Sequence, residues 1–190
     1  MPNYYLDIET TGLDPKKDKI ITIQFMELDM TTAEPVGDLI ILKEWESSEK
    51  KIIEKFIEMS KITDPYPFSF VPVGYNLGFE HNFFLERCKL HKLDVVDILS
   101  RPFIDLRVCG VIMNKGQFKG SGLDKITGKS HDGSVIPEWY KENNYKKIEE
   151  YIKTEAEEFA KFCMWVYKEL PDCLKKFRET NNIKKVDLNE

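Results

Sequence analysis

The first ten residues alternate between two kinds of side chain. One side of the alternation is apolar or aromatic, and the other combines an aromatic residue with two acids: Tyr4, Leu6 and Ile8 against Tyr5, Asp7 and Glu9. A period of two residues predicts a β-strand. Because Asp7 and Glu9 are two positions apart, both carboxylates point to the same side of that strand. The chain then turns at Gly12, which would allow a close approach of the backbone.

Two more strands and a helix follow the first turn. The apolar run over 20–28 predicts a second strand that forms a hairpin with the first, and residues 38–43 predict a third strand. Ser47 or Ser48 is a suitable N-cap for a helix that runs to about Ser60. One face of this helix is apolar: Ile52, Ile53, Phe56 and Ile57.

The next segments alternate between short strands and helices. Residues 69–74 predict a short strand that ends in Gly-Tyr-Asn, and a helix is expected to begin near Gly78. Residues 94–99 are expected to form a short helix, 102–105 a short strand and 106–113 another helix. Three strands, a helix and then this alternation predict an α/β fold with a mixed sheet covered by helices on both faces.

The last third of the chain begins with an irregular segment and ends in a long helix. Residues 115–145 contain five Gly and one Pro, with a helical turn expected at 123–127. A stripe at helical spacing then predicts the long helix: Ile148, Tyr151, Ile152, Glu155, Phe159, Cys163 and Val166. Pro171 is expected to end or kink it, and a polar tail over about 172–190 follows. Residues 1–190 are expected to form a single domain.

Composition excludes several classes of protein. The chain is 42% hydrophobic and 12% aromatic, which is typical of a globular domain. We find no basic region followed by an apolar run at the start and no stretch of about 18 apolar residues, so no secretory signal, transmembrane helix or membrane partner is expected. The four cysteines lie far apart, which favours buried free thiols in a reducing cytoplasm. The net charge of −5 is weak evidence against nucleic acid, because metal-binding carboxylates would contribute to it.

The pair Asp7 and Glu9 has two interpretations. Two neighbouring anions among aromatic and apolar side chains repel each other and lose hydration, unless a cation lies between them. The alternative is an edge strand with two solvated acids.

The unbroken string Asp-Ile-Glu-Thr-Thr-Gly-Leu, residues 7–13, resembles the first motif of the DEDD superfamily of 3′→5′ exonucleases. This resemblance implies a ribonuclease-H-like fold, with a mixed central sheet of about five strands flanked by helices on both faces.

A second segment resembles the family's motif Asn-x-x-Phe-Asp. Asn76, Phe79 and Glu80 occupy its three places, with Glu in place of Asp. Glu80 falls in the first turn of the expected helix, so the alternative is an ordinary acid favoured by the helix dipole.

A third segment lies on the last helix. Tyr151 and Glu155 are one turn apart and project from one side. They resemble the motif Tyr-x-x-x-Asp of the tyrosine branch, again with Glu for Asp. The alternative assigns Glu155 to a solvated acidic run with Glu157 and Glu158. The histidine branch is excluded, because Ile136 stands where an acid would have to follow His131.

The resemblance also implies a cofactor, a partner and roles for the residues. Two divalent metal ions, Mg²⁺ or Mn²⁺, would be held by the carboxylates and would activate water. The implied catalytic residues are Asp7, Glu9, Glu80, Tyr151 and Glu155, and the four acids among them are the implied metal ligands. The implied substrate-binding residues are Thr10, Leu13, Asn76 and Phe79. The partner would be the single-stranded 3′ end of DNA or RNA.

Two questions stay open on sequence alone. Lysines in the irregular segment are either phosphate contacts or part of a soluble loop: Lys115, Lys119, Lys125 and Lys129. The chain is either an active metal-dependent 3′→5′ exonuclease that releases 5′-mononucleotides, or a degenerate module that binds nucleic acid or a protein without cutting. The two Asp-to-Glu departures motivate the second reading, whereas the retained charges and Tyr151 favour the first.

Overall fold

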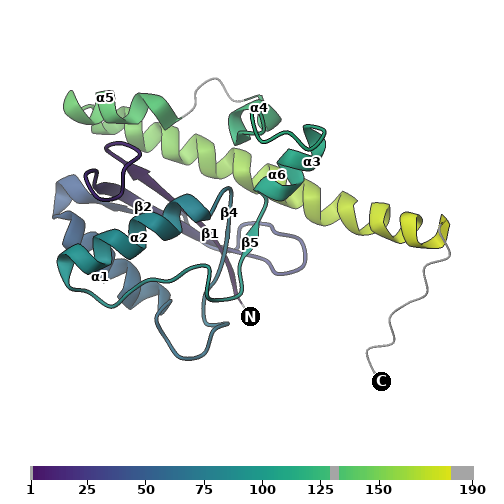
Figure 1. The fold of residues 1–190 in the computed structure, drawn as a ribbon, viewed down its shortest axis with the longest axis horizontal. Helices are drawn as coiled ribbons and strands as arrows, with labels where there is room; N and C mark the ends of the chain where they lie inside the picture. Colours follow the sequence, from purple (N-terminus) through teal and green to yellow (C-terminus); the bar gives the residue numbers. More distant parts are fainter. Residues whose placement is uncertain (1, 129–132, 181–190) are drawn as a thin grey trace.

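The computed structural model describes residues 2–128 and 133–180, and in this part the chain forms one mixed sheet (Figure 1). Its strands are β1 (Asn3–Thr10), β2 (Ile20–Leu28), β3 (Ile40–Lys43), β4 (Val71–Gly74) and β5 (Ile104–Asp105). Their order is β3-β2-β1-β4-β5. β2 is antiparallel to β1 and β3, whereas β4 is parallel to β1 and β5. The predicted α/β fold with about five strands is confirmed.

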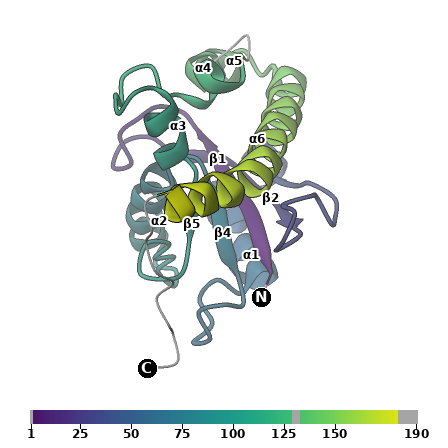
Figure 2. The same cartoon turned by 90° about the vertical axis from the view of Figure 1, so that its right-hand side faces the viewer.

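The two faces of β1 are buried under different helices. Leu6 and Ile8 pack with α1 (Glu49–Ser60) and α2 (Gly78–His91) in one core cluster. Tyr5, on the opposite face, packs with Phe159 and its neighbours on α6 (Tyr145–Thr180). Figures 1 and 2 show α6 crossing the length of the molecule on the other side of the sheet from α1 and α2. The alternation read from the sequence therefore separates two cores.

Several elements begin and end where the sequence predicts. β2 has the expected bounds, and α1 starts after Ser48, whose Oγ accepts a hydrogen bond from the Lys51 amide at 3.3 Å. α3 (Arg107–Met113) and α4 (Leu123–Thr127) also lie in their expected places.

A buried ion cluster joins α1 and α2 to the start of β2. The Glu49 carboxylate accepts from Arg87 Nε at 2.7 Å and Arg87 Nη2 at 2.6 Å, and from the Ile20 amide at 2.8 Å. His91 Nε2 lies 2.8 Å from the same carboxylate. Burial alone would raise the pKa of Glu49, but the hydrogen bonds from Arg87 and His91 lower it. His91 therefore has a structural role.

The helix predicted over 94–99 is wrong. These residues carry no helical assignment, and they alternate between burial and exposure: Val96 and Ile98 are buried, whereas Val95 and Leu99 are exposed. Alternating burial of β-branched residues favours an extended backbone over a helix.

The end of the last helix also differs from the prediction. α6 continues through Pro171 to Thr180. A proline inside a helix removes one backbone hydrogen bond, here at the Tyr167 carbonyl. Every residue from 168 to 180 is exposed, so water can bond this carbonyl and no packed neighbour opposes the ring. The polar tail thus begins as helix.

One further segment and the burial of the cysteines differ in detail from the prediction. The segment expected to be irregular contains the short helices η2 (Gly133–Val135) and α5 (Ile136–Lys141), of which Ile136 is buried. The cysteines are free, but Cys173 is exposed and Cys109 is half-buried, so only Cys88 and Cys163 are the expected buried thiols. Among the described helices, we find none long and apolar enough to cross a membrane.

Candidate active site

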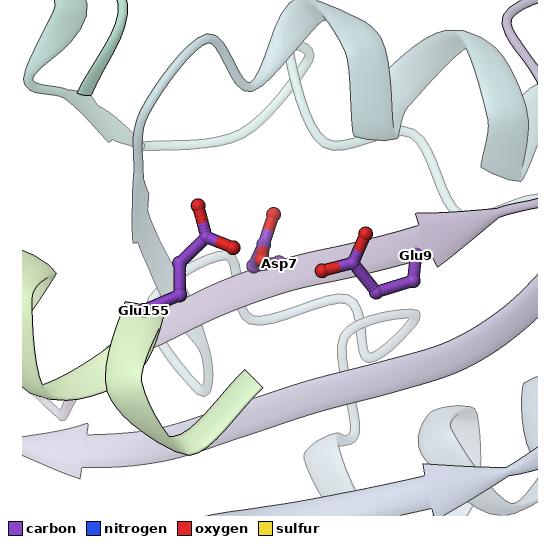
Figure 3. A group of neighbouring side chains, drawn as sticks. All are labelled: Asp7, Glu9 and Glu155. Atoms are coloured by element: carbon purple, nitrogen blue, oxygen red, sulfur yellow. The ribbon is translucent and has the colours of Figure 1, made fainter. Parts of the chain in front are cut away.

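Three carboxylates from two elements meet above the centre of the sheet. Asp7 and Glu9 project from β1, and Glu155 projects from α6 (Figure 3). Each contributes one oxygen to a group in which all oxygens lie within 4.8 Å of one another. Glu155 reaches this point because its neighbours on the stripe, Ile152 and Phe159, are buried against the sheet and orient the helix.

Asp7 lies between the other two acids in Figure 3. Burial and then the charge of Glu155 raise the pKa of Asp7 to about 7. A hydrogen bond from Gln24 Nε2, 2.8 Å long, acts in the opposite direction. Gln24 faces Asp7 across the β1–β2 pairing and is itself fixed by Thr22 Oγ1 at 3.0 Å. The sequence reading missed Gln24; the strand register could have found it.

Glu80 is the fourth acid at this place. It is 4% exposed in the first turn of α2, and burial together with the charge of Asp7 raises its pKa well above the usual range. Its carboxyl group shares a hydrogen bond with that of Asp7, which requires a proton on one of them. The other oxygen, Oε2, is buried and has no hydrogen-bond partner among the described residues.

Tyr151 borders the carboxylates from α6. It is 8% exposed, and Trp139 packs edge-on against its ring with the centroids 6.2 Å apart. Burial and the charges of Glu155 and Glu9 raise the pKa of its hydroxyl, which hydrogen-bonds to Glu155. A Cβ at Gly133 would lie 3.6 Å from the Tyr151 hydroxyl and 3.9 Å from Glu9 Oε2. The phenol therefore stays protonated beside the acids.

A cavity of about 220 Å³ opens next to the acids. Acids and a phenol form one part of its wall and a cation forms another; the lining includes Asp7, Tyr75, Asn76, Arg107, Tyr151 and Glu155. Arg107 was missed at the sequence level, because only the packing of α3 beside β4 and β5 brings it to the acids. Arg107 is the group of this wall that would attract a negatively charged part of a ligand.

The backbone that leads into α2 is held by Asp105 at the end of β5. The Asp105 carboxylate accepts from the amides of Asn76 at 2.8 Å, Leu77 at 3.0 Å and Arg107 at 2.9 Å. Asn76 has φ +74°, a conformation that Asn adopts more readily than most residues. Asp105 thus positions Asn76 at the cavity and Glu80 one turn later. The sequence reading did not single out Asp105.

The remaining predicted substrate-binding residues are not among those that line the cavity. Leu13 is 84% exposed in the turn after β1. Thr10 Oγ1 donates to the Gly12 carbonyl at 2.6 Å. The Asp18 carboxylate occupies the space that a Cβ at Gly12 would need, so the absence of a side chain at Gly12 makes room for Asp18. Phe79 packs against Phe83, with ring centroids 4.8 Å apart.

The candidate lysines are peripheral. Lys115 and Lys119 are exposed after α3, and Lys125 pairs with Asp124 at 3.1 Å. Lys129 and His131 lie outside the described residues.

The carboxylate group fits a divalent cation. Its members offer hard oxygen ligands within one small volume, which is the donor set that Mg²⁺ and Mn²⁺ prefer. Burial and then the charge of Glu155 raise the pKa of Asp7, and a bound cation would offset both effects. The residues that could hold such an ion are Asp7, Glu9 and Glu155, with Glu80 beside Asp7.

Comparisons with known proteins give the family. The model of the RNase_H superfamily matches residues 4–168. An uncharacterized protein of Methanocaldococcus jannaschii is 29% identical over 196 residues, which cover 91% of this chain and 97% of the relative.

Solved structures share the fold. E. coli exonuclease I in complex with a dT13 oligonucleotide superposes with a TM-score of 0.58 at 13% identity, over 92% of this chain and 43% of that one. A crystal structure of SSB/Exonuclease I in complex with the inhibitor CFAM gives a TM-score of 0.51 at 14% identity, over 70% of this chain and 38% of that one. The chain spans less than half the length of these exonuclease chains. Since the family model covers most of the sequence, the chain belongs to the RNase_H superfamily.

Proposed function

We propose that this protein is a metal-dependent 3′→5′ exonuclease of the tyrosine branch of the DEDD superfamily. It would hydrolyse phosphodiester bonds of DNA or RNA from the 3′ end and release 5′-mononucleotides. The observation that carries the proposal is the convergence of Asp7, Glu9 and Glu155 within 4.8 Å, beside Glu80 and Tyr151. The shared fold with exonuclease I, which binds an oligonucleotide in one of those structures, supports it.

Two divalent ions, Mg²⁺ or Mn²⁺, are the proposed cofactors. Asp7, Glu9 and Glu155 would hold one ion, and Asp7 with Glu80 the other. When bound, such ions lower the pKa of water and neutralise charge on the attacking and leaving oxygens. Occupation would also keep Asp7 and Glu80 deprotonated, in place of the hydrogen bond that the two carboxyl groups share.

Tyr151 would orient the attacking water. Its raised pKa keeps the hydroxyl protonated at neutral pH, so it can hold a water by a hydrogen bond but does not act as a base. The position of Tyr151 beside Glu155 and Glu9 would bring this donor next to the proposed ions.

The direction of cleavage would come from the turn after β1 and from the loop before α2. The exposed Leu13 would wedge against the terminal base, and the Thr10 backbone would face the 3′-hydroxyl. Asn76 would line the pocket for the terminal nucleotide, and Phe79 would support the same wall.

The two glutamates in aspartate places favour a second candidate, a module that binds nucleic acid or a protein without cutting. An added methylene moves a carboxylate by about 1.5 Å at fixed backbone. Against this candidate, Glu155 still reaches Asp7 and Glu9.

The decisive experiment is digestion of end-labelled single-stranded DNA and RNA oligonucleotides with Mg²⁺ or Mn²⁺. We expect shortening from the 3′ end, loss of cleavage in chelator and its return with added metal. Asp7→Asn should abolish cleavage without unfolding the protein. Cleavage that survives excess chelator or Asp7→Asn, or internal cuts in a circular strand, would contradict the proposal. Metal and oligonucleotide binding without cleavage would favour the binding module.

A further inference from the structure

Arg107 is a cation without an anionic partner in the described structure. It begins α3, directly after β5, and lines the cavity that Asp7 and Glu155 also line. Its Nε is buried and makes no hydrogen bond, and within residues 2–128 and 133–180 its guanidinium forms no salt bridge. Leaving a buried charged donor unpaired is costly. Because Arg107 lines the cavity and forms no salt bridge among the described residues, its guanidinium fits a ligand that supplies acceptor oxygens.

Two acids in this region, Asp124 and Asp105, already have other partners. Asp124, which lines the same cavity, pairs with Lys125 at 3.1 Å. The Asp105 carboxylate accepts from three backbone amides, among them that of Arg107 itself. Among the described residues neither carboxylate forms a salt bridge with the guanidinium, which lines the cavity.

The surroundings hold the guanidinium in place. Its carbon lies over the Phe118 ring, 5.8 Å from the ring centroid. Tyr75 forms the adjoining wall and is fixed by a hydrogen bond from its hydroxyl to the Ser121 carbonyl. The planar fork of a guanidinium matches two oxygens of a phosphate.

The volume of the cavity limits the size of the ligand that it can hold. At about 220 Å³ it is smaller than the roughly 300–1,000 Å³ of pockets for drug-sized molecules. It has room for a phosphate and its sugar, with the base outside or in the mouth.

We propose that Arg107 binds the 5′-phosphate of the 3′-terminal nucleotide. This inference rests on the proposed exonuclease function. In that reaction water adds to this phosphate and the bond to the 3′-oxygen of the preceding nucleotide breaks. The preceding nucleotide leaves with a 3′-hydroxyl, and the released mononucleotide keeps the phosphate. Arg107 therefore holds the same group before and after cleavage, and the protein binds its own product.

The test measures binding of the product, which requires no turnover. Calorimetric titrations with 5′-AMP, 5′-dAMP and adenosine, in Mg²⁺, compare the wild type with Arg107→Gln and Arg107→Lys. Arg101→Gln is the matched control, because the Arg101 guanidinium donates to the carbonyls of Asp64 at 2.8 Å and Tyr66 at 3.0 Å, outside the cavity. Thermal melting of each variant reports whether it is folded.

We expect Arg107→Gln to weaken the binding of both nucleotides at least tenfold, which corresponds to about 1.4 kcal/mol of binding free energy. Arg107→Lys should bind with intermediate affinity, because it keeps the charge but loses the fork. Arg101→Gln should bind as the wild type does, and adenosine should show no dependence on Arg107. A preference between the two nucleotides would indicate the sugar of the natural substrate, and either preference supports the site.

Nucleotide affinity equal to the wild type in folded Arg107→Gln, or no nucleotide binding by the wild type at millimolar concentration, overturns the inference. Arg107-dependent binding by a protein that cuts no oligonucleotide would leave the phosphate site standing and remove the exonuclease function. Normal cleavage of oligonucleotides, together with nucleotide binding that does not depend on Arg107, would support the exonuclease function and remove the phosphate site.

Discussion

At Asp7 a single carboxylate experiences opposing influences. Burial and Glu155 favour the protonated form, whereas Gln24 donates to the ionised one. The first two prevail, so the folded protein holds a proton on Asp7 up to a pH of about 7, compared with 3.8 for an unperturbed carboxyl. Between these two values the folded state binds more protons than the unfolded state, and stability falls as pH rises.

This gives a prediction for the metal-free protein. In chelator, the free energy of unfolding should decrease from about pH 4 to about pH 7, by on the order of 1.4 kcal/mol for each unit of pKa shift. Asp7→Asn should flatten that decrease and be the more stable protein at pH 8. Urea titrations across the window measure both. A wild type and variant with parallel pH profiles would show that Asp7 is not the titrating group.

The two glutamates in aspartate places give a graded prediction. Glu155→Gln should reduce cleavage at saturating Mn²⁺ by about 100-fold or more, because the ligand charge is lost. Glu155→Asp should lose more activity than Glu80→Asp, since Glu155 belongs to the close carboxylate group and a shorter side chain on the packed helix cannot follow.

Glu157→Gln is the matched control, because Glu157 is exposed on the same helix. Each turnover number is compared with the melting temperature of the same variant. If Glu155→Gln cuts as fast as Glu157→Gln, Glu155 is surface charge and another ligand must complete the site.

The residues that form the site differ in how far sequence reveals them. Asp7 and Glu9 are set by the period of a strand, and Tyr151 and Glu155 by one helical turn, so spacing alone places each pair on one side. Gln24, Asp105 and Arg107 reach the site only through strand pairing and through the packing of α3. No local pattern contains that information.

On the scale of elements, the end of β5 determines where α2 begins. Asp105→Ala would leave the amides of Asn76 and Leu77 without their acceptor and should cost about 1–3 kcal/mol of unfolding free energy. Because Glu80 follows in the first turn of α2, cleavage should fall as well.

Asp29→Ala separates these two effects. Asp29 also accepts from two backbone amides, those of Thr31 and Thr32 at 2.8 Å, but in an exposed turn. We expect this control to cut normally. Cleavage by Asp105→Ala and Asp29→Ala is compared below the melting temperatures of both. If the two variants lose cleavage equally, Asp105 acts on stability alone.

Helices and strands were predictable where one face is buried. They were uncertain where contacts with the rest of the fold determine the secondary structure. β2 and α1 follow their apolar patterns. The apolar residues within 94–99 suit both periods, and in the structure Val96 and Ile98 are buried in the core that also contains α2 residues, without forming a helix. Pro171 predicts an end to α6, but an exposed helix tolerates the missing bond.

On the scale of the whole molecule, a single helix connects the site to the surface. α6 carries Tyr151 and Glu155 in its buried half and continues as an exposed rod from 168 to 180 (Figure 1). We propose that residues up to about 171 form one exonuclease domain and that the rest is an appendage, because Val166 is the last residue of α6 buried in the core.

The exposed half of α6 also presents a thiol. Cys173 is exposed, whereas Cys88 and Cys163 are buried and Cys109 is half-buried, so a maleimide dye should react first at Cys173. At about 1.5 Å per residue, the attachment point lies about 27 Å along the helix axis from Glu155. That separation suits energy transfer to a labelled oligonucleotide. The protein thus carries a natural attachment point for following single molecules as a strand shortens.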